Sequence, residues 1–427
     1  MRYAIYTLGC KVNFYESEYV NKLLKEHNYI EEKFNDICDI YIINTCAVTN
    51  TADSKSMKMI RQARKRNPKA LIIVMGCFIE KQKEDLGELE KVADIIIGTK
   101  DKSKIIELIE EYKNKQTIIE HLYRYEEKNT FEDMFIDNFE NRTRAFVKIQ
   151  DGCENFCSYC IIPFVRGKRK SKDKDIVIKE ITSLVSNGYK EIVLTGIHTG
   201  SYGVDINTSF AKLLEEIVNI KGLKRLRISS IEITELNNDV LKLIKQYNII
   251  VDHLHIPLQS GSDKILKLMN RKYDVNYYIN KVNEIRKIRP LISITTDVIV
   301  GFPGEDDKDF LETIETVKKI AFSKVHVFPY SIREGTKAAT MKDQVSDVVK
   351  KERARTLIEV SKELEIKYME QFLGMEVEVL TEQVKDGYTY GHTSNFLYVK
   401  IPGSISHNTF VKVVIEEVIY PYLIGGR

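Results

Sequence analysis

Short apolar runs alternate with amphipathic segments over residues 1–112. The apolar runs predict strands, and the segments between them have the period of helices. Strands are expected at 3–8, 40–44, 71–75 and 95–97, and helices at 16–26, 54–66, 80–90 and 103–112. This alternation predicts an α/β fold with a doubly wound parallel sheet that carries helices on both faces.

A second series of strand–helix units begins near residue 145. Strand-like runs fall at 146–149, 192–195, 225–229, 253–257, 292–300 and 324–328, with segments of helical length between them. A closed barrel of this kind needs eight units, so six predict an open, partial (β/α)6 barrel. Its active site is expected at the carboxyl ends of the strands.

The pattern changes again toward the end of the chain. Residues 347–372 form a long, charged helical pattern, and short alternating strands follow at 376–380, 388–392, 397–401 and 409–415, which predicts a small all-β barrel. Between the two α/β regions lies a charged stretch without a sustained period, which Phe131, Phe135 and Phe139 would dock on a neighbour. The expected division is therefore 1–112, a linker 113–143, a core 144–342, a helical connector 343–373 and a barrel 374–427.

Length and composition indicate a globular protein of two or three domains. No run approaches the roughly 20 apolar residues of a membrane span, and the N-terminus leads directly into a strand-like pattern without a signal peptide. We therefore expect a cytoplasmic protein with no membrane partner. The net charge of +3 is too small to indicate a nucleic-acid partner by itself.

Three cysteines, Cys153, Cys157 and Cys160, follow the strand at 146–149 with the spacing C-x3-C-x2-C. They are too few for a four-ligand zinc site or a disulfide framework, and no cysteine follows Cys160. Three thiols on one loop suit a cubane iron–sulfur cluster with three protein-bound irons and one iron open to a ligand. A zinc loop or separate buried thiols are the alternatives.

Three more cysteines each come at the carboxyl end of an expected N-terminal strand: Cys10, Cys46 and Cys77. Because the carboxyl ends of parallel strands form the ligand crevice of an open sheet, these thiols are expected to converge. Gly9 and Gly76 permit the tight turns that this requires. The alternative is that each thiol is a small apolar residue at the end of a buried strand. Cys38 precedes its strand, so we expect a core thiol there.

Two basic runs are candidates for a polyanion site. One is 61–66 with Lys55, Lys58 and Lys69; the other is 166–172, which begins six residues after Cys160 and would bring a bound polyanion near the cysteine loop. A basic helix is more often a solvated face. In the last domain, four aromatic side chains would either stack on bases or fill the barrel core: Tyr388, Tyr390, Phe396 and Tyr398.

With both cysteine sets in place, the chain resembles the radical S-adenosylmethionine (SAM) methylthiotransferase family over nearly its whole length. The family order is an N-terminal cluster domain, a radical SAM core and the RNA-binding barrel called TRAM. Besides the cysteines, the blocks 194–196, 256–262 and 297–305 carry the resemblance. The segment 10–13, Cys-Lys-Val-Asn, is similar to the branch that acts on N6-threonylcarbamoyladenosine in tRNA, whereas the isopentenyladenosine branch usually has Gln-Met at Lys11 and Val12. Ile233 and Phe14 depart from the branch pattern, which tends to have proline and glutamine there.

The resemblance implies two 4Fe-4S clusters and two SAM molecules per turnover. The cluster on Cys153, Cys157 and Cys160 would reduce SAM to a 5′-deoxyadenosyl radical, which removes hydrogen from C2 of the adenine. The cluster on Cys10, Cys46 and Cys77 would donate a sulfur that another SAM methylates. Five residues would bind SAM: Phe156, Tyr159, Gly196, Ser229 and Gln259. The glycine and the polar residues among them follow strands, where they also suit ordinary turns. The implied partners are tRNA, an electron donor such as flavodoxin or ferredoxin, and a sulfur source.

Other functions remain open at this point. One alternative is a methylthiotransferase that acts on isopentenyladenosine in tRNA. Another is a methylthiotransferase that acts on a ribosomal-protein side chain, in which case the basic runs are incidental. A non-catalytic RNA-binding protein with structural metal is a third class, although structural sites normally close their coordination. Release of 5′-deoxyadenosine from SAM distinguishes an enzyme from such a protein. Lys11 would pair with the carboxylate of threonylcarbamoyladenosine if it faces the site.

Overall fold

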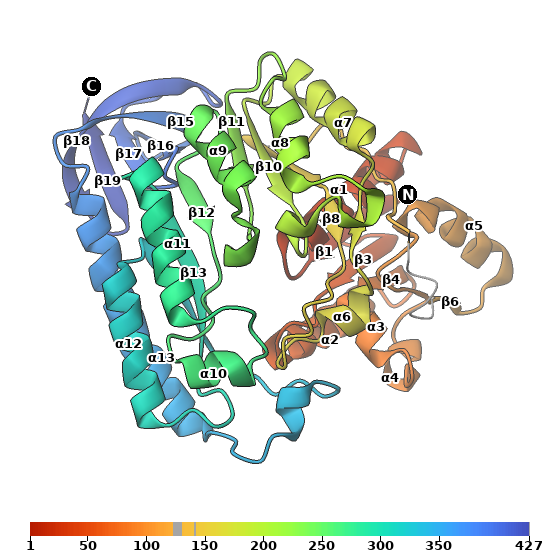
Figure 1. The fold of residues 1–427 in the computed structure, drawn as a ribbon. Coiled ribbons are helices and arrows are strands. Elements are labelled where there is room, and N and C mark those ends of the chain that lie inside the picture. The colour runs from red at the N-terminus through yellow and green to blue at the C-terminus, as the bar shows by residue number, and fades with distance from the viewer. Residues whose placement is uncertain (123–129, 141, 427) are drawn as a thin grey trace.

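The computed structural model describes residues 1–122, 130–140 and 142–426. Its N-terminal region is the expected doubly wound sheet, with six strands in the order β2-β1-β3-β4-β5-β6 and every neighbouring pair parallel (Figure 1). The strands are β1 (Arg2–Thr7), β2 (Ile30–Glu31), β3 (Ile40–Thr45), β4 (Leu71–Gly76), β5 (Ile95–Ile97) and β6 (Ile119–His121). The helices are α1 (Lys11–Glu26), α2 (Asn50–Arg66), α3 (Cys77–Gln82), α4 (Gly87–Glu90) and α5 (Ile105–Lys115).

The central strands β3 and β4 are buried along their whole length, which explains their unbroken apolar sequences. Alternate side chains enter two separate cores, with Ile43 and Val74 on one face and Ile42 and Ile73 on the other. The helix expected at 80–90 is instead two short helices, α3 and α4. Strands β2 and β6 escaped prediction because they are edge strands of two and three residues, too short to show a period.

The described parts of the expected linker, 113–122, 130–140 and 142–143, are more closely packed than a linker. Strand β6 completes the first sheet beyond the expected end of the domain at residue 112. Farther along, Met134, Ile136 and Phe139 are buried in the main core, where Phe139 stacks on Phe14 with 6.3 Å between ring centroids. Isolated apolar residues that pack on a distant domain show no local period, so the sequence pattern did not reveal them.

The core is the expected partial barrel. Its strands form two parallel sheets, β7-β10-β11 and β12-β13-β14, which isolated parallel bridges between 226 and 250 and between 230 and 255 join into one curved wall. The strands are β7 (Arg144–Lys148), β10 (Glu191–Thr195), β11 (Arg225–Ile228), β12 (His253–His255), β13 (Ser293–Val300) and β14 (Lys324–Pro329), with the small pair β8 (Gln150–Asp151) and β9 (Lys170–Ser171) beside them. The helices are α6 (Ile162–Arg166), α7 (Lys174–Ser186), α8 (Phe210–Ile217), α9 (Asn238–Gln246), α10 (Asp263–Leu268), α11 (Val275–Ile288) and α12 (Asp307–Ile320).

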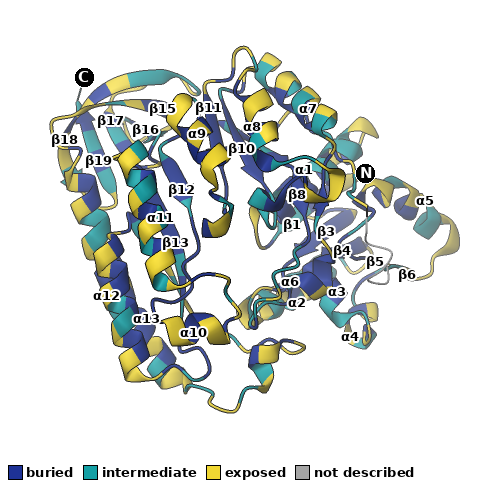
Figure 2. Cartoon of the chain, in the orientation of Figure 1, coloured by how far each residue is buried: buried dark blue, intermediate teal, exposed yellow. Residues whose placement is uncertain are grey.

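Side chains along the barrel strands alternate between two environments. Apolar residues such as Val147, Leu194 and Leu226 pack under the outer helices, whose buried faces turn toward the strands (Figure 2). The alternate positions include charged residues, among them Glu191 and Arg227, which form an ion pair at 2.8 Å on the inner side of the wall. The barrel therefore has a polar interior.

Both edges of the open wall contact the N-terminal domain. At the β7 edge, Lys148 binds Glu16 of α1 with 2.8 Å between nitrogen and oxygen. Beyond β14, Arg333 binds Asp53 of α2 at 2.7 Å and donates to the carbonyl of Val48 at 3.0 Å. The N-terminal domain therefore spans the open side of the partial barrel.

The C-terminal region is the expected closed barrel, with strand order β15-β16-β17-β19-β18, and it follows the long helix α13 (Asp347–Glu370). Its strands are β15 (Glu376–Lys385), β16 (Tyr388–Thr393), β17 (Tyr398–Pro402), β18 (Phe410–Ile419) and β19 (Tyr422–Gly426), the last of which was not expected. Arg144 and Arg225, at the amino ends of β7 and β11, bind the side chain of Glu382 and the carbonyl of Glu378. This barrel therefore covers the amino ends of the core strands. Every helix in the described ranges is too short or too polar for a membrane span.

Candidate active site

The structure brings Cys10, Cys46 and Cys77 to neighbouring positions at one edge of the first sheet. They follow β1, β3 and β4, which are adjacent and in parallel register. Gly9 has a φ of +101°, and a Cβ built on it would lie 3.0 Å from the Cys46 sulfur, so the chain needs glycine there. Burial raises the pKa of Cys77 to about 12, and the nearby thiols of Cys10 and Cys46 act in the same direction.

The second set, Cys153, Cys157 and Cys160, lies on the loop between β8 and α6. The amide of Cys160 donates to the carbonyl of Cys157 at 2.9 Å, which curls the loop. Ser158 anchors it to the end of α10 by donating to the carbonyl of Leu268 at 2.6 Å. Burial raises the pKa of Cys160 to about 12, with Cys157 and Cys153 adding to the effect.

The donor atoms of both sets fit iron–sulfur clusters. Within the described ranges, no group of three or more His, Cys, Asp and Glu residues is arranged to hold a single metal ion. A cluster differs because each thiol binds a different iron, so its ligands stand farther apart, and an all-thiol donor set is the one that iron–sulfur clusters use. Each set also has a cationic donor on one sulfur: Arg166 Nε lies 3.2 Å from Cys77 Sγ, and Arg271 Nη1 lies 3.2 Å from Cys157 Sγ.

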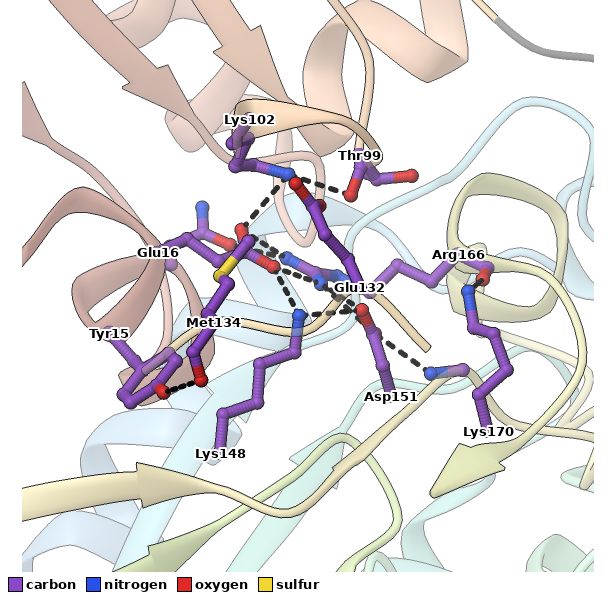
Figure 3. Close-up of polar contacts among 12 residues, drawn as sticks. Tyr15, Glu16, Thr99, Lys102, Glu132, Met134, Lys148, Asp151, Arg166 and Lys170 are labelled. Carbon is purple, nitrogen blue, oxygen red and sulfur yellow. Dashed lines mark hydrogen bonds and ion pairs between the residues drawn. The ribbon is translucent and has the colours of Figure 1, made fainter. Parts of the chain in front are cut away.

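Arg166 belongs to a buried charge network that joins the two domains (Figure 3). Its guanidinium binds Glu16 at 2.9 Å and Asp151 at 3.0 Å, and Lys148 binds the same two carboxylates at 2.8 Å each. Lys102 approaches Glu16 to 3.4 Å. Burial disfavours the charged form of Glu16, but Arg166, Lys102 and Lys148 outweigh it and hold its pKa well below the usual range.

This network corrects the interpretation of the basic run 166–172 as a polyanion site. Arg166 and Lys172 are fully buried, and Lys170 is 7% exposed. Arg169 binds Glu154 at 2.8 Å, and Lys168 alone among the cations of the run is exposed. The run looks like a solvated basic patch in sequence, but its partners Glu16, Asp151 and Glu180 take up most of its charge.

The other basic run keeps an accessible stripe. Four cations of α2 are exposed and recur at intervals of three or four residues, so they share one helix face: Lys55, Lys58, Arg61 and Lys65. Arg64 and Arg66 turn away from that face and bind Asp94 and the carbonyl of Phe34. The stripe lies on the helix that follows Cys46.

The five expected cofactor positions occupy different places. Tyr159 and Gln259 line a cavity of about 220 Å³ together with Cys160 and, from the N-terminal domain, Val48 and Thr49. This cavity therefore adjoins the core cysteine loop and the turn after Cys46.

The remaining three positions are not among the residues that line this cavity. Phe156 is 46% exposed and packs edge-on against Phe164. Gly196 approaches the side chain of Gln150, which a Cβ would meet at 3.1 Å. The hydroxyl of Ser229 lies 3.2 Å from that of Thr199.

Lys11 lies at the start of α1, with an exposed side chain beside Cys10. Partial desolvation lowers its pKa to about 8, and the like charges of Arg227 and Arg144 on the inner wall of the barrel act in the same direction. Phe14, one helical turn after Lys11, packs edge-on against Phe146 of β7 with 5.2 Å between ring centroids. The face of α1 that carries Lys11 therefore lies against the barrel wall.

The aromatic residues of the C-terminal barrel lie outside its core. Along β16 and β17, buried residues such as Thr389 and Val399 alternate with aromatic residues, and the aromatic side chains are partly exposed. Ring centroids are 5.6 Å apart between Tyr390 and Tyr398, and 4.5 Å apart between His392 and Phe396. These rings form a half-exposed strip, which is what a base-stacking surface requires.

Several site residues escaped the sequence interpretation. Glu16, Arg271 and Arg333 act through partners that are distant along the chain, and no local pattern marks them. Arg271 also binds Glu232, from the turn after β11, which holds its guanidinium toward the cysteine loop. Cys38, in contrast, is buried in the core as expected.

Comparisons with family models and solved structures identify the fold and point to the class of protein. Residues 147–317 match the model of the radical SAM superfamily, and residues 2–98 match that of the uncharacterized protein family UPF0004. The radical SAM methyltransferase TsrM from Kitasatospora setae shares the fold, with a TM-score of 0.56 and 13% identity over 79% of this chain and 75% of that chain. The cobalamin-dependent radical enzyme OxsB has a TM-score of 0.53 and 11% identity over 85% and 56%. The chain is a radical SAM enzyme, a class that uses SAM and a 4Fe-4S cluster.

Curated relatives narrow this class. The threonylcarbamoyladenosine tRNA methylthiotransferase of Bacillus subtilis is 43% identical over 98% of this chain and 94% of its own length, and that of Thermotoga maritima is 39% identical over 97% and 95%. The tRNA-2-methylthio-N(6)-dimethylallyladenosine synthase of Clostridium botulinum is 38% identical over 88% and 85%. The chain belongs to the radical SAM methylthiotransferase family.

Proposed function

We propose that the protein methylthiolates C2 of N6-threonylcarbamoyladenosine next to the anticodon of tRNA, giving 2-methylthio-N6-threonylcarbamoyladenosine. The observation that carries the proposal is the meeting of two thiol sites at one place. Cys77 packs with Ile161 and Val165, which directly follow the core cysteine loop. The B. subtilis and T. maritima relatives, which span nearly the whole chain, supply the tRNA substrate.

Six cysteines would hold the two clusters. Cys153, Cys157 and Cys160 would bind the SAM-cleaving cluster, and Cys10, Cys46 and Cys77 the second one. When bound, the clusters supply the electron that cleaves one SAM and the sulfur that a second SAM methylates. C2 of adenine has neither a leaving group nor an acidic proton, so its substitution requires chemistry of this kind.

The chain's own residues would position and shield these groups. Arg166 and Arg271 donate to one thiol in each set and so favour its anionic, metal-bound form. Tyr159 and Gln259 line the cavity beside Cys160, where SAM would lie, and Phe156, Gly196 and Ser229 would complete its contacts. The N-terminal domain spans the open side of the barrel and limits the access of water to the reacting atoms.

Two surfaces would bind the RNA in this proposal. The exposed cations of α2 would contact phosphates. The aromatic strip of the C-terminal barrel would stack on bases, which makes that barrel a TRAM module. An electron donor such as flavodoxin or ferredoxin and a source of replacement sulfur complete the partners, and tRNA as substrate places the reaction in the cytoplasm.

The test uses the full-length protein reconstituted with iron and sulfide under anaerobic conditions. With SAM, a reductant and tRNA that carries threonylcarbamoyladenosine, we expect 5′-deoxyadenosine and the methylthiolated nucleoside in the same reaction. Replacing Cys10, Cys46 and Cys77 by alanine should abolish the second product and leave the first. Release of 5′-deoxyadenosine with methylthiolation of isopentenyladenosine tRNA alone would contradict the proposed substrate.

A further inference from the structure

A cation without a counter-ion lies beside the N-terminal cysteine site. The ammonium of Lys11 makes no ion pair or hydrogen bond with any residue in 1–122, 130–140 or 142–426. The other cations near the two thiol sites differ, because Arg166, Lys148 and Arg271 each bind carboxylates. Lys11 is therefore free to bind an anion that comes from outside the chain.

The barrel wall next to Lys11 holds two further polar atoms without a partner. Arg227 is 3% exposed, and although its Nε binds Glu191 at 2.8 Å, its Nη1 is buried without a partner. His253, on the neighbouring strand β12, is 8% exposed and has no partner for Nδ1. Arg227 and His253 lie together on this wall, because both contact the ring of Phe396, at 4.5 and 5.3 Å from its centroid. Burial, with the positive charges of Arg227 and Lys11 nearby, holds the pKa of His253 well below its usual range, so its imidazole is neutral.

Buried donors without partners are unfavourable, and like charges placed together add to the cost. A carboxylate relieves both, because it is anionic and its two oxygens accept several hydrogen bonds. An RNA phosphate has the same properties, so the charge pattern alone identifies an oxyanion. Position favours the carboxylate, because Lys11 adjoins Cys10 and the barrel interior, whereas the exposed stripe of α2 is available to the RNA backbone.

We propose that Lys11, with Arg227 and His253 behind it, binds the carboxylate of the threonylcarbamoyl group and thereby determines substrate specificity. This inference rests on the proposed function, because it assigns the contact that selects the modified base. An adenine whose carboxylate is held at Lys11 lies beside the N-terminal thiol site. The isopentenyl group has no acceptor, so isopentenyladenosine would leave the Lys11 ammonium and Arg227 Nη1 without a partner.

The test measures how tightly the reconstituted enzyme binds three forms of one anticodon stem–loop RNA. The first carries threonylcarbamoyladenosine, the second carries the same group with its carboxylate amidated, and the third carries unmodified adenosine. The wild type should bind the carboxylate form about 10- to 100-fold more tightly than the amide, as expected for a charge-assisted hydrogen bond. Equal binding of these two forms by the wild type would overturn the inference without any variant.

Variants then locate the contact. Lys11→Gln should remove the preference for the carboxylate, and Lys11→Arg should retain it, with iron content and RNA-independent SAM cleavage reporting that the thiol sites are intact. Lys58→Gln, on the exposed stripe of α2, is the control and should weaken all three RNAs alike. If Lys11→Gln also weakened all three alike, Lys11 would bind a phosphate and the inference would be wrong. Normal carboxylate preference without any methylthiolation would instead overturn the proposed function alone.

Discussion

Replacing Glu16 by glutamine should loosen the contact between the N-terminal domain and the barrel. The Glu16 carboxylate is fully buried and binds Lys148 and Arg166 at 2.8 and 2.9 Å, with Lys102 at 3.4 Å. Without it, Asp151 is the remaining carboxylate for Lys148 and Arg166, and Lys102 loses its ion pair with Glu16. Removing one member of a buried ion pair costs about 3–5 kcal/mol, because the partner charge stays buried.

Urea unfolding followed by far-UV circular dichroism measures this effect, since the chain has no tryptophan. With a urea dependence of about 3 kcal/mol per molar, the midpoint of Glu16→Gln should fall by about 1–2 M. Glu26→Gln is the matched control, because it makes the same change at an exposed position of α1 whose nearest cation is 3.8 Å away, and we expect it to shift stability by no more than about 0.5 kcal/mol. Equal midpoints for the two variants would refute this reading of the network.

The pH dependence of the Glu16 effect has a defined sign. The folded-state pKa of Glu16 lies below its unfolded value of about 4.3, so the contribution is fully present above that value. It is lost as pH falls toward the folded-state pKa. The stability difference between wild type and Glu16→Gln should therefore be constant near neutral pH and shrink in acid.

Three further predictions concern the thiol sites and the RNA surface. Alanine at Cys153, Cys157 and Cys160 should remove about half of the bound iron and all SAM cleavage, whereas alanine at Cys10, Cys46 and Cys77 should also halve the iron but leave abortive SAM cleavage. Full iron content in the second variant would exclude the N-terminal cluster. The control Cys38→Ala should keep both clusters. Neutralising Lys55, Lys58, Arg61 and Lys65 should weaken tRNA binding and flatten its salt dependence by about 0.7–0.9 log unit per lost phosphate contact, and an unchanged slope would make α2 an ordinary solvated face. Arg271→Gln should shift the midpoint potential of the core cluster, measured by EPR, to more negative values, because a cationic donor to Cys157 is lost. The control Arg355→Gln, at an exposed position, should leave the potential unchanged. Equal potentials for wild type and Arg271→Gln would show that Arg271 does not act on the cluster.

Local patterns explain what the sequence predicted well. Buried strands followed by Gly9-Cys10 and Gly76-Cys77 carry their own signal, because the apolar run, the turn and the thiol are contiguous. The register of neighbouring parallel strands then brings the thiols together. The same logic located the six main barrel strands.

Contacts between distant segments explain the features that the sequence did not predict. Arg166 meets Glu16 across 150 residues, so a run of cations that looks solvated is buried by partners that the local sequence does not show. Phe139 likewise reaches the core through Phe14 and Tyr189. In the C-terminal barrel, alternation identified two faces but not which one points outward, and the small buried Thr389 and Gly391 assign the aromatic side chains to the outer face.

The central claim is that this chain methylthiolates threonylcarbamoyladenosine in tRNA. The most direct measurement is mass spectrometry of tRNA nucleosides from a strain that lacks the enzyme, with and without the gene for this chain. The account predicts that the gene restores 2-methylthio-N6-threonylcarbamoyladenosine in tRNAs that read codons beginning with A. It also predicts that the variant with alanine at Cys10, Cys46 and Cys77 does not. Restoration of 2-methylthio-N6-isopentenyladenosine with threonylcarbamoyladenosine left unmodified at C2 would contradict it.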